Sequence, residues 1–235
     1  MSLKIAVIGN TGMNIGAAIA GDMALAGHDV RFLLWPDQLE CLEACRAAGG
    51  IHVGEPASKT ISGKTGLAAI PVITDDPAEA IAGADLVVVN EVQLNLEARA
   101  ADFIPHLENG QVLHVNMHGY WPGFRLAAML READKAGVTV TEGVTPTHAA
   151  ARTGAHITPG FIRRALPLAA FPANRSETAL DRLAAIKIRR ALPERDRDEP
   201  REHEPADSSG DGVAQCRILR PGESKGRACQ FLRDR

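Results

Sequence analysis

The feature that most constrains this chain is its opening, where an apolar run breaks on a glycine-rich loop that leads into an alanine-rich segment. Residues 4–8 favour a buried strand, Gly9, Gly12 and Gly16 punctuate the loop, and residues 17–28 continue as a helix before a second apolar run at 29–35. This order is typical of the first β-α-β unit of a dinucleotide-binding fold. There, glycines let the backbone approach a pyrophosphate, and the N-terminus of the helix attracts it.

The glycine spacing is G-x-x-G-x-x-x-G rather than G-x-G-x-x-G, so the loop is identified by its strand-helix context more than by the motif. We predict that the loop holds the cofactor phosphates, through Gly9, Asn10, Thr11, Gly12, Met13 and Gly16. A tight strand-to-helix turn without a ligand is the alternative interpretation.

Strands and helices continue to alternate along the chain. The pattern predicts helices at 37–48, from Asp76-Pro77, at 94–107 and at 122–136, with buried strands at 84–90, 111–116 and 138–142. Short strands within 51–74 are interpreted as an extra hairpin. The sequence therefore predicts an α/β fold with a doubly wound, mostly parallel Rossmann sheet and a small β-hairpin insertion.

Ligands of such sheets bind beyond the carboxyl ends of the strands, and this rule selects further candidates. Trp35 and Asp37 follow the second strand, while Asn90 and Asn116 follow two later ones. Asp37 suits a ribose hydroxyl, although a helix cap is an equal alternative. The pattern does not choose between NAD and NADP.

Four side chains near these strand ends are candidates for substrate chemistry: His118, Glu142, His148 and Arg152. Arg152 suits a carboxylate because its planar fork binds one bidentately. The alternatives are a helix-capping role for His118, an exposed loop position for His148, and solvated side chains for Glu142 and Arg152. His114 alternates with apolar residues and is expected in the core.

Composition argues against several other classes. A net charge of −3 gives no reason to expect a nucleic acid or an anionic membrane as partner, and no apolar run is long enough to span a bilayer. Cys41 and Cys45 lack further ligands nearby, so we expect reduced cysteines and no metal site. These features predict a cytoplasmic protein and leave the oligomeric state open.

Several segments together resemble the opine dehydrogenases, the octopine/nopaline dehydrogenase-like enzymes. The resemblance covers roughly residues 3–186 and rests on the glycine loop and on the segments 26–28, 85–91, 107–112, 116–120, 141–142 and Arg152. The chain departs from the family at 90–93, where a proline and a histidine are usual, and at 149–152, where the family has Tyr-x-x-Arg.

The resemblance implies a function as well as a fold. It implies an NAD(P)-dependent dehydrogenase acting on CH-NH groups, which condenses an amino acid with an α-keto acid reductively. In that family a helical domain follows the Rossmann domain and contributes a histidine for acid-base work. A non-catalytic NAD(P)-binding protein, or an inactive remnant, is the alternative.

The composition changes sharply near residue 188. Of the 47 residues from 189 onward 21 are charged, against 34 of the 188 before them. Such a segment cannot bury enough apolar surface to offset its chain entropy, so we expect a Rossmann domain at 1–187 and a disordered tail at 188–235.

A shifted reading frame would explain this break. Permitted codons for 194–216, read one base later, encode a string that resembles the start of the family's catalytic domain, with its acid-base histidine across Ser208 and Ser209. A genuine charged tail is the alternative.

Overall fold

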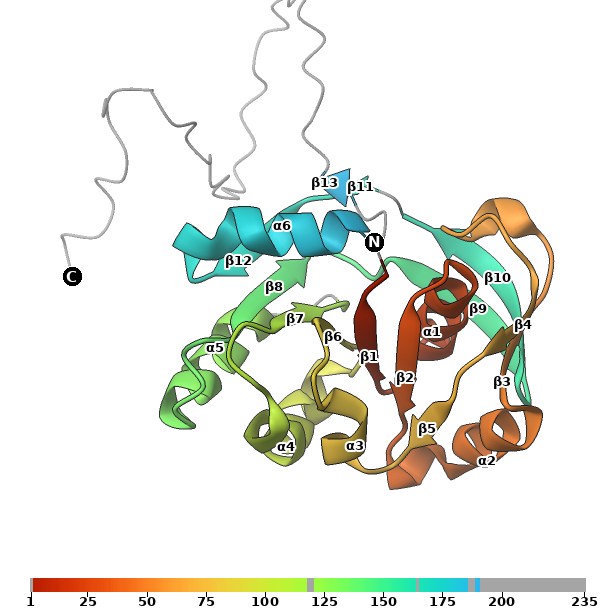
Figure 1. Ribbon diagram of the computed structural model, residues 1–235, viewed down its shortest axis with the longest axis horizontal. Coiled ribbons are helices and arrows are strands. Elements are labelled where there is room, and N and C mark those ends of the chain that lie inside the picture. The colour runs from red at the N-terminus through yellow and green to blue at the C-terminus, as the bar shows by residue number, and fades with distance from the viewer. Residues whose placement is uncertain (1, 118–120, 164, 186–188, 191–235) are drawn as a thin grey trace, which may run out of the picture. The chain divides into compact units, whose positions relative to one another are not determined.

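The computed structural model describes residues 2–117, 121–163, 165–185 and 189–190 (Figure 1). These residues lie in one compact unit within Met1–Pro193. The expected disordered tail lies outside the described residues except at 189–190, and so does the candidate His118.

Seven strands form the central sheet, in the order β12-β8-β7-β6-β1-β2-β5. Six of them run parallel, and only β12 pairs antiparallel, with β8. This arrangement confirms the predicted doubly wound α/β sheet, and the chain reverses its direction of winding between β1 and β6. The strands are β1 (Lys4–Ile8), β2 (Asp29–Leu33), β5 (Val72–Thr74), β6 (Leu86–Val89), β7 (Val112–Val115), β8 (Thr139–Gly143) and β12 (Leu168–Phe171).

Both faces of the sheet are buried because successive side chains of a strand point to opposite faces. In β1, Ile5 and Val7 join one core and Ala6 and Ile8 join the other. The first core takes side chains from α1, α2 and α6, and the second takes them from α3, α4 and α5. The helices are α1 (Ile15–Leu25), α2 (Leu39–Ala48), α3 (Pro77–Ile81), α4 (Gln93–Phe103), α5 (Pro122–Glu132) and α6 (Ser176–Ala185).

Three expected helices end earlier than the sequence suggested. The helix predicted over 17–28 is α1, which ends at Leu25. The helix predicted at 94–107 is α4, which gives way at Phe103 to the short 3-10 helix η3 (Ile104–His106), where Pro105 cannot donate to an α-helical ladder. The helix predicted at 122–136 ends at Glu132, since Asp134 adopts a left-handed conformation with φ of 56°. The other 3-10 helices among the described residues are η1 (Pro36–Gln38), η2 (Ala57–Lys59) and η4 (Ala173–Arg175).

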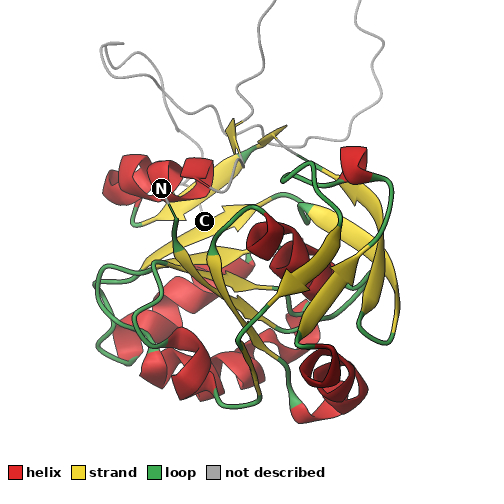
Figure 2. Cartoon of the chain, turned by 45° about the vertical axis from the view of Figure 1, so that its right-hand side comes forward, coloured by secondary structure: helices red, strands yellow, loops and turns green. Residues whose placement is uncertain are grey.

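The predicted hairpin forms part of a second sheet, seen at the right of Figure 2. Strands β3 (Gly50–Val53) and β4 (Gly66–Ala69) pair antiparallel, as expected. Two strands without a sequence prediction complete this sheet, β9 (His148–Thr153) and β10 (His156–Ile162), in the order β4-β3-β10-β9. The sheet packs against α1, so it covers the helix that follows the glycine loop. A further short pair joins β11 (Ala165–Leu166) and β13 (Arg189–Arg190).

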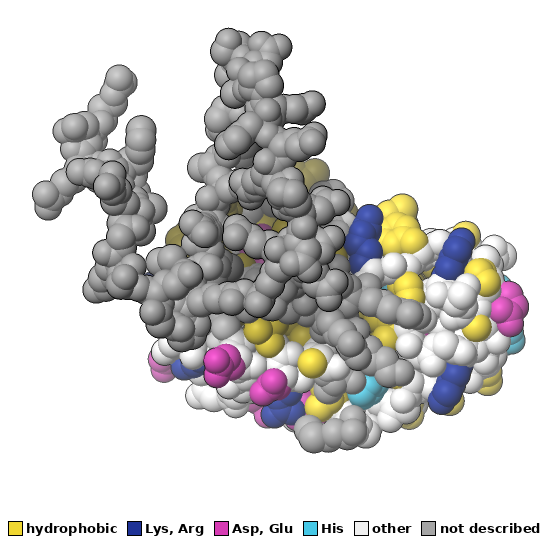
Figure 3. Space-filling view, turned by 90° about the horizontal axis from the view of Figure 1, so that it is seen from above, with side chains coloured by type: hydrophobic (Ala, Val, Ile, Leu, Met, Phe, Trp, Pro, Cys, Tyr) yellow, Lys and Arg dark blue, Asp and Glu magenta, His cyan; other side chains and the backbone are white. Residues whose placement is uncertain are grey.

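The surface carries mixed side chains. On the coloured part of the face in Figure 3, hydrophobic, basic and acidic side chains are interspersed. Among the described residues, no helix has the length and apolarity needed to cross a bilayer.

Candidate functional site

The glycine loop after β1 adopts the close helix-strand packing that a phosphate-binding turn requires. Gly9 has a φ of 76°, a left-handed conformation that favours glycine. A Cβ on Gly16 would lie 1.8 Å from the Gly9 carbonyl oxygen, so only glycine lets α1 approach β1 this closely. The Asn10 side chain accepts a hydrogen bond from Ala17 N at 2.9 Å and thereby caps the first turn of α1.

Neighbouring strand ends anchor this loop at the winding reversal. Thr11 Oγ1 donates to the carbonyl of Asn90 at 2.6 Å, which ties the loop to the end of β6. Gln38 Oε1 accepts from the backbone N–H groups of Asn10 and Trp35, which ties it to the end of β2. The structure therefore brings the predicted residues Gly9, Thr11, Trp35 and Asn90 together at the carboxyl end of the sheet.

The tip of the loop is exposed. Gly12 and Met13 are exposed, and no hydrogen bond between described residues uses either backbone N–H. Gly12 has a φ of 65°, and the α1 N-terminus adds its partial positive charge beside these groups. Together with the Gly16 contact, this arrangement fits the pyrophosphate of a dinucleotide.

The end of β2 carries a cluster of aromatic and charged side chains. Trp35 is buried, and the Arg99 guanidinium of α4 lies 4.8 Å from its ring centroid. Asp37 pairs with Arg99 at 2.8 Å and caps neither η1 nor α2, so the capping alternative for Asp37 is wrong. The indole Nε1 of Trp35 is buried without a partner among the described residues and faces Gly9, 3.5 Å from where a Cβ would stand.

Glu91 is an ionisable residue beside the glycine loop that sequence reasoning did not select. It is 2% exposed, its carboxyl lies 3.4 Å from the Cβ position of Gly9, and it is the second residue after β6. Burial raises the pKa of this carboxyl, and the hydrogen bond that it accepts from Val92 N opposes the rise only in part. A charged residue directly after an apolar strand was the signal for it.

The candidate Glu142 has a structural partner. Its Oε2 accepts from Gly123 N at 2.8 Å, and a Cβ on Gly123 would lie only 2.6 Å from the same oxygen. The carboxylate thus caps the first turn of α5, although burial still raises its pKa.

Arg152 and His148 lie in β9 and are also engaged. Arg152 donates to Gly154 O at 2.7 Å and contacts Asn14 and Glu40. His148 is 2% exposed and pairs with Asp22 at 3.0 Å, so its expected alternative position on an exposed loop is wrong.

The remaining predictions concern buried groups. The Asn90 and Asn116 side chains are fully buried and bond to each other at 2.8 Å, so a ligand at these strand ends would meet main chain. His114 is in the core as expected, bonded to Thr141. Cys41 and Cys45 are free thiols 4.0 Å apart, and no group of residues suited to a metal ion occurs among the described residues.

Comparisons with known proteins give the fold. No family model and no curated protein matches the chain. Octopine dehydrogenase in complex with NADH and agmatine is 20% identical, with a TM-score of 0.58 over 72% of this chain and 42% of that one. Yersinopine dehydrogenase with NADP+ bound is 15% identical, with a TM-score of 0.60 over 82% and 47%. A 2-dehydropantoate 2-reductase from Porphyromonas gingivalis W83 is 22% identical, with a TM-score of 0.59 over 83% and 66%.

These similarities show a Rossmann fold of the kind found in opine dehydrogenases and ketopantoate reductases. The chain spans less than half the length of the two opine dehydrogenases that it resembles.

Proposed function

We propose that this chain binds NAD or NADP in the crevice between β1 and β6 and serves an NAD(P)-dependent oxidoreductase of the opine dehydrogenase type as its cofactor domain. The observation that carries the proposal is the glycine loop, with Gly16 packed on Gly9 and the N–H groups of Gly12 and Met13 at the α1 N-terminus. Similar structures contain NADH or NADP+, which supports the same cofactor class here.

The proposed substrates are an amino acid and an α-keto acid. The three octopine dehydrogenase structures hold NADH with agmatine, with L-arginine or with pyruvate. The bound cofactor would supply hydride to a carbon-nitrogen double bond. The glycine loop of this chain would hold the dinucleotide, and the ends of β6 and β7 would limit how far the dinucleotide enters the site.

A second candidate is an NAD(P)-binding protein without catalysis. It is favoured by the contacts of the described catalytic candidates, because Glu142 caps α5, His148 is buried and Arg152 bonds within the protein. An assay of NADH and NADPH oxidation with mixed amino acids and α-keto acids separates the two candidates. Binding with turnover supports the enzyme, and binding without turnover supports the second candidate.

A pair of glycine variants tests the binding site itself. Gly12 and Gly49 have φ values of 65° and 67°, so valine strains both positions alike, but Gly49 lies at the far end of α2. Gly12→Val should weaken NAD(P) binding about tenfold or more, since its side chain would meet the phosphates, while Gly49→Val should leave affinity unchanged. Calorimetric affinities that are equal in the two variants would exclude this loop as the site.

A further inference from the structure

The residue at the N-cap position of α1 does not cap its own helix. Asn14 adopts a left-handed conformation there, with φ of 50° and ψ of 40°, and its side chain makes no capping hydrogen bond. Asn10 provides the cap instead, since its Oδ1 accepts from Ala17 N at 2.9 Å. The side-chain amide of Asn14 is therefore available for contacts outside the helix.

That amide links the glycine loop to strand β9. Asn14 Nδ2 donates to the Ala150 carbonyl at 3.2 Å, and Asn14 Oδ1 accepts from Arg152 Nε at 3.3 Å. A carbonyl can only accept and a guanidinium can only donate, so these two partners fix the orientation of the amide. Asn10 Nδ2 also donates to Asn14 Oδ1, at 3.3 Å, which ties the start of the loop to the same link.

A backbone hydrogen bond makes a second link between the loop and β9. Ala150 N donates to the Met13 carbonyl at 2.9 Å. The peptide bond between Met13 and Asn14 is trans, so the N–H of Asn14 points in the direction opposite to this carbonyl, away from β9. No hydrogen bond between described residues uses that N–H. Strand β9 therefore sets the direction of a donor at the N-terminus of α1.

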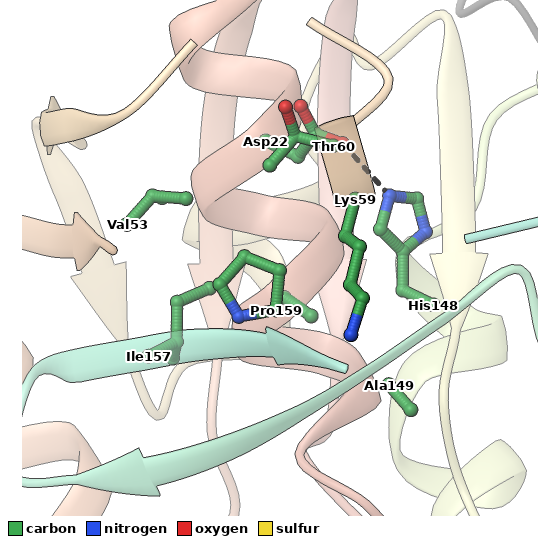
Figure 4. Close-up of a pocket in the computed structure, with 9 residues that line it drawn as sticks. Asp22, Val53, Lys59, Thr60, His148, Ala149, Ile157 and Pro159 are labelled. Carbon is green, nitrogen blue, oxygen red and sulfur yellow. Dashed lines mark hydrogen bonds and ion pairs between the residues drawn. The ribbon is translucent and has the colours of Figure 1, made fainter. Parts of the chain in front are cut away.

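Strand β9 is itself fixed at both ends of these links. Figure 4 shows His148 of β9 turned toward Asp22 of α1, and His148 Nε2 lies 3.0 Å from Asp22 Oδ2. Both residues are at most 2% exposed, so β9 is held against α1 two residues before Ala150. Arg152 is held near the end of β9, because its guanidinium donates to the Gly154 carbonyl at 2.7 Å.

We propose that β9 holds the glycine loop in the conformation that binds the dinucleotide phosphates, with Asn14 and Arg152 as positioning residues. The proposal rests on the function proposed above, because it concerns the same loop. A loop that is ordered before binding loses less conformational entropy when the cofactor binds. These contacts therefore contribute to affinity although the two side chains need not contact the cofactor, and the second sheet takes part in cofactor binding.

Backbone NMR relaxation of the chain without cofactor tests whether β9 orders the loop. Arg152→Met removes the bond to Asn14 Oδ1, so the order parameters of Gly12 and Met13 should fall from about 0.85, typical of rigid backbone, toward about 0.6. Arg46→Met is the matched control, since Arg46 also donates to a carbonyl and pairs with an acid, but on the last turn of α2. Loop order that is equal in wild type and both variants would overturn the proposal.

A double-mutant cycle on NADH and NADPH affinity tests whether Arg152 acts through Asn14. Arg152→Met should weaken binding about fivefold and Asn14→Gly about tenfold, since glycine keeps the left-handed conformation but lacks the amide. Among the described residues, the hydrogen bonds of Arg152 reach the loop only at Asn14, so the double variant should bind about as weakly as Asn14→Gly alone. Losses that multiply to about fiftyfold would contradict this route, and unchanged affinity in Arg152→Met would refute the positioning role.

The control variant separates this role from a general effect of losing a surface arginine. Arg46→Met should bind both dinucleotides as wild type does, and its urea midpoint should be close to that of Arg152→Met. An equal loss of affinity in the two variants would refute a specific role for Arg152. Failure of wild type to bind either dinucleotide would refute the proposed function, while the NMR experiment would still decide whether β9 orders the loop.

Discussion

Gly16→Ala provides a sharp test of the packing that forms the crevice. A Cβ at Gly16 would lie 1.8 Å from the Gly9 carbonyl oxygen and 2.9 Å from its carbonyl carbon, whereas Cβ atoms in proteins keep about 3.0 Å from other heavy atoms. Both obstacles are backbone, so α1 and the loop have to separate by about 1.2 Å. Forced separation of a packed interface costs about 3 kcal/mol, which exceeds the gain of about 1 kcal/mol from replacing a helical glycine.

Gly21→Ala in the same helix is the matched control. A Cβ at Gly21 would meet the Val53 Cγ2 at 2.8 Å and the Ile51 Cγ2 at 3.1 Å, and both are side-chain methyl groups rather than backbone, with a far smaller overlap than at Gly16. Its stability should therefore stay within about 1 kcal/mol of wild type.

Urea denaturation followed by circular dichroism measures both variants, with the free energy of unfolding taken by linear extrapolation. Gly16→Ala should lower that free energy by about 2 kcal/mol or more relative to Gly21→Ala. Equal stabilities would mean that α1 does not approach β1 as closely as the structure shows.

Three further variants test the buried and charged groups. Burial lowers the pKa of His114 from 6.5 to about 4, so the stability that the neutral ring contributes is complete above pH 6.5 and falls by about 3 kcal/mol as pH drops toward 4. In urea titrations, His114→Gln should lack this loss of stability, and the exposed control His106→Gln should keep it. Asp22→Asn should cost about 3–5 kcal/mol by breaking a buried pair, whereas Asp75→Asn at a surface pair should cost at most about 1 kcal/mol in the same titrations. Asp37→Asn removes a carboxylate that would repel a 2′-phosphate and frees its partner Arg99. Calorimetry should therefore show that the ratio of NADPH affinity to NADH affinity rises about tenfold, and an unchanged ratio would place the ribose elsewhere.

Local patterns predicted the central sheet well. The runs at 4–8, 84–90 and 111–116 are apolar and bounded by turn residues, and each is a buried parallel strand in the structure. The glycine loop was predictable because its function depends on backbone conformations that glycine adopts and other residues rarely do. The strand ends then located Trp35, Asn90 and Asn116, because parallel strands place their carboxyl ends on one edge.

The second sheet was not predictable from local sequence. Strands β9 and β10 contain alanine, threonine, glycine and proline without clear alternation, and β10 pairs with β3, about a hundred residues earlier in the chain. Their conformation is decided by packing against α1, and no hydrophobic periodicity in the local sequence indicates that packing.

The polar contacts of the site were hidden for the same reason. Asp22 and His148 are 126 residues apart, and Arg99 reaches Trp35 from another helix. One signal was present: Asp22 is the sole charge in the otherwise apolar segment 15–25, and a carboxylate there needs a buried partner.

The most direct measurement of the central claim is a titration of the chain with NADH and NADPH, followed by amide NMR. We predict saturable binding of at least one dinucleotide, with the largest shifts at residues 9–16 and smaller ones at Trp35 and at the ends of β6 and β7. The absence of saturable binding, or shifts that leave the glycine loop unaffected, would contradict the assignment of this crevice as a dinucleotide site.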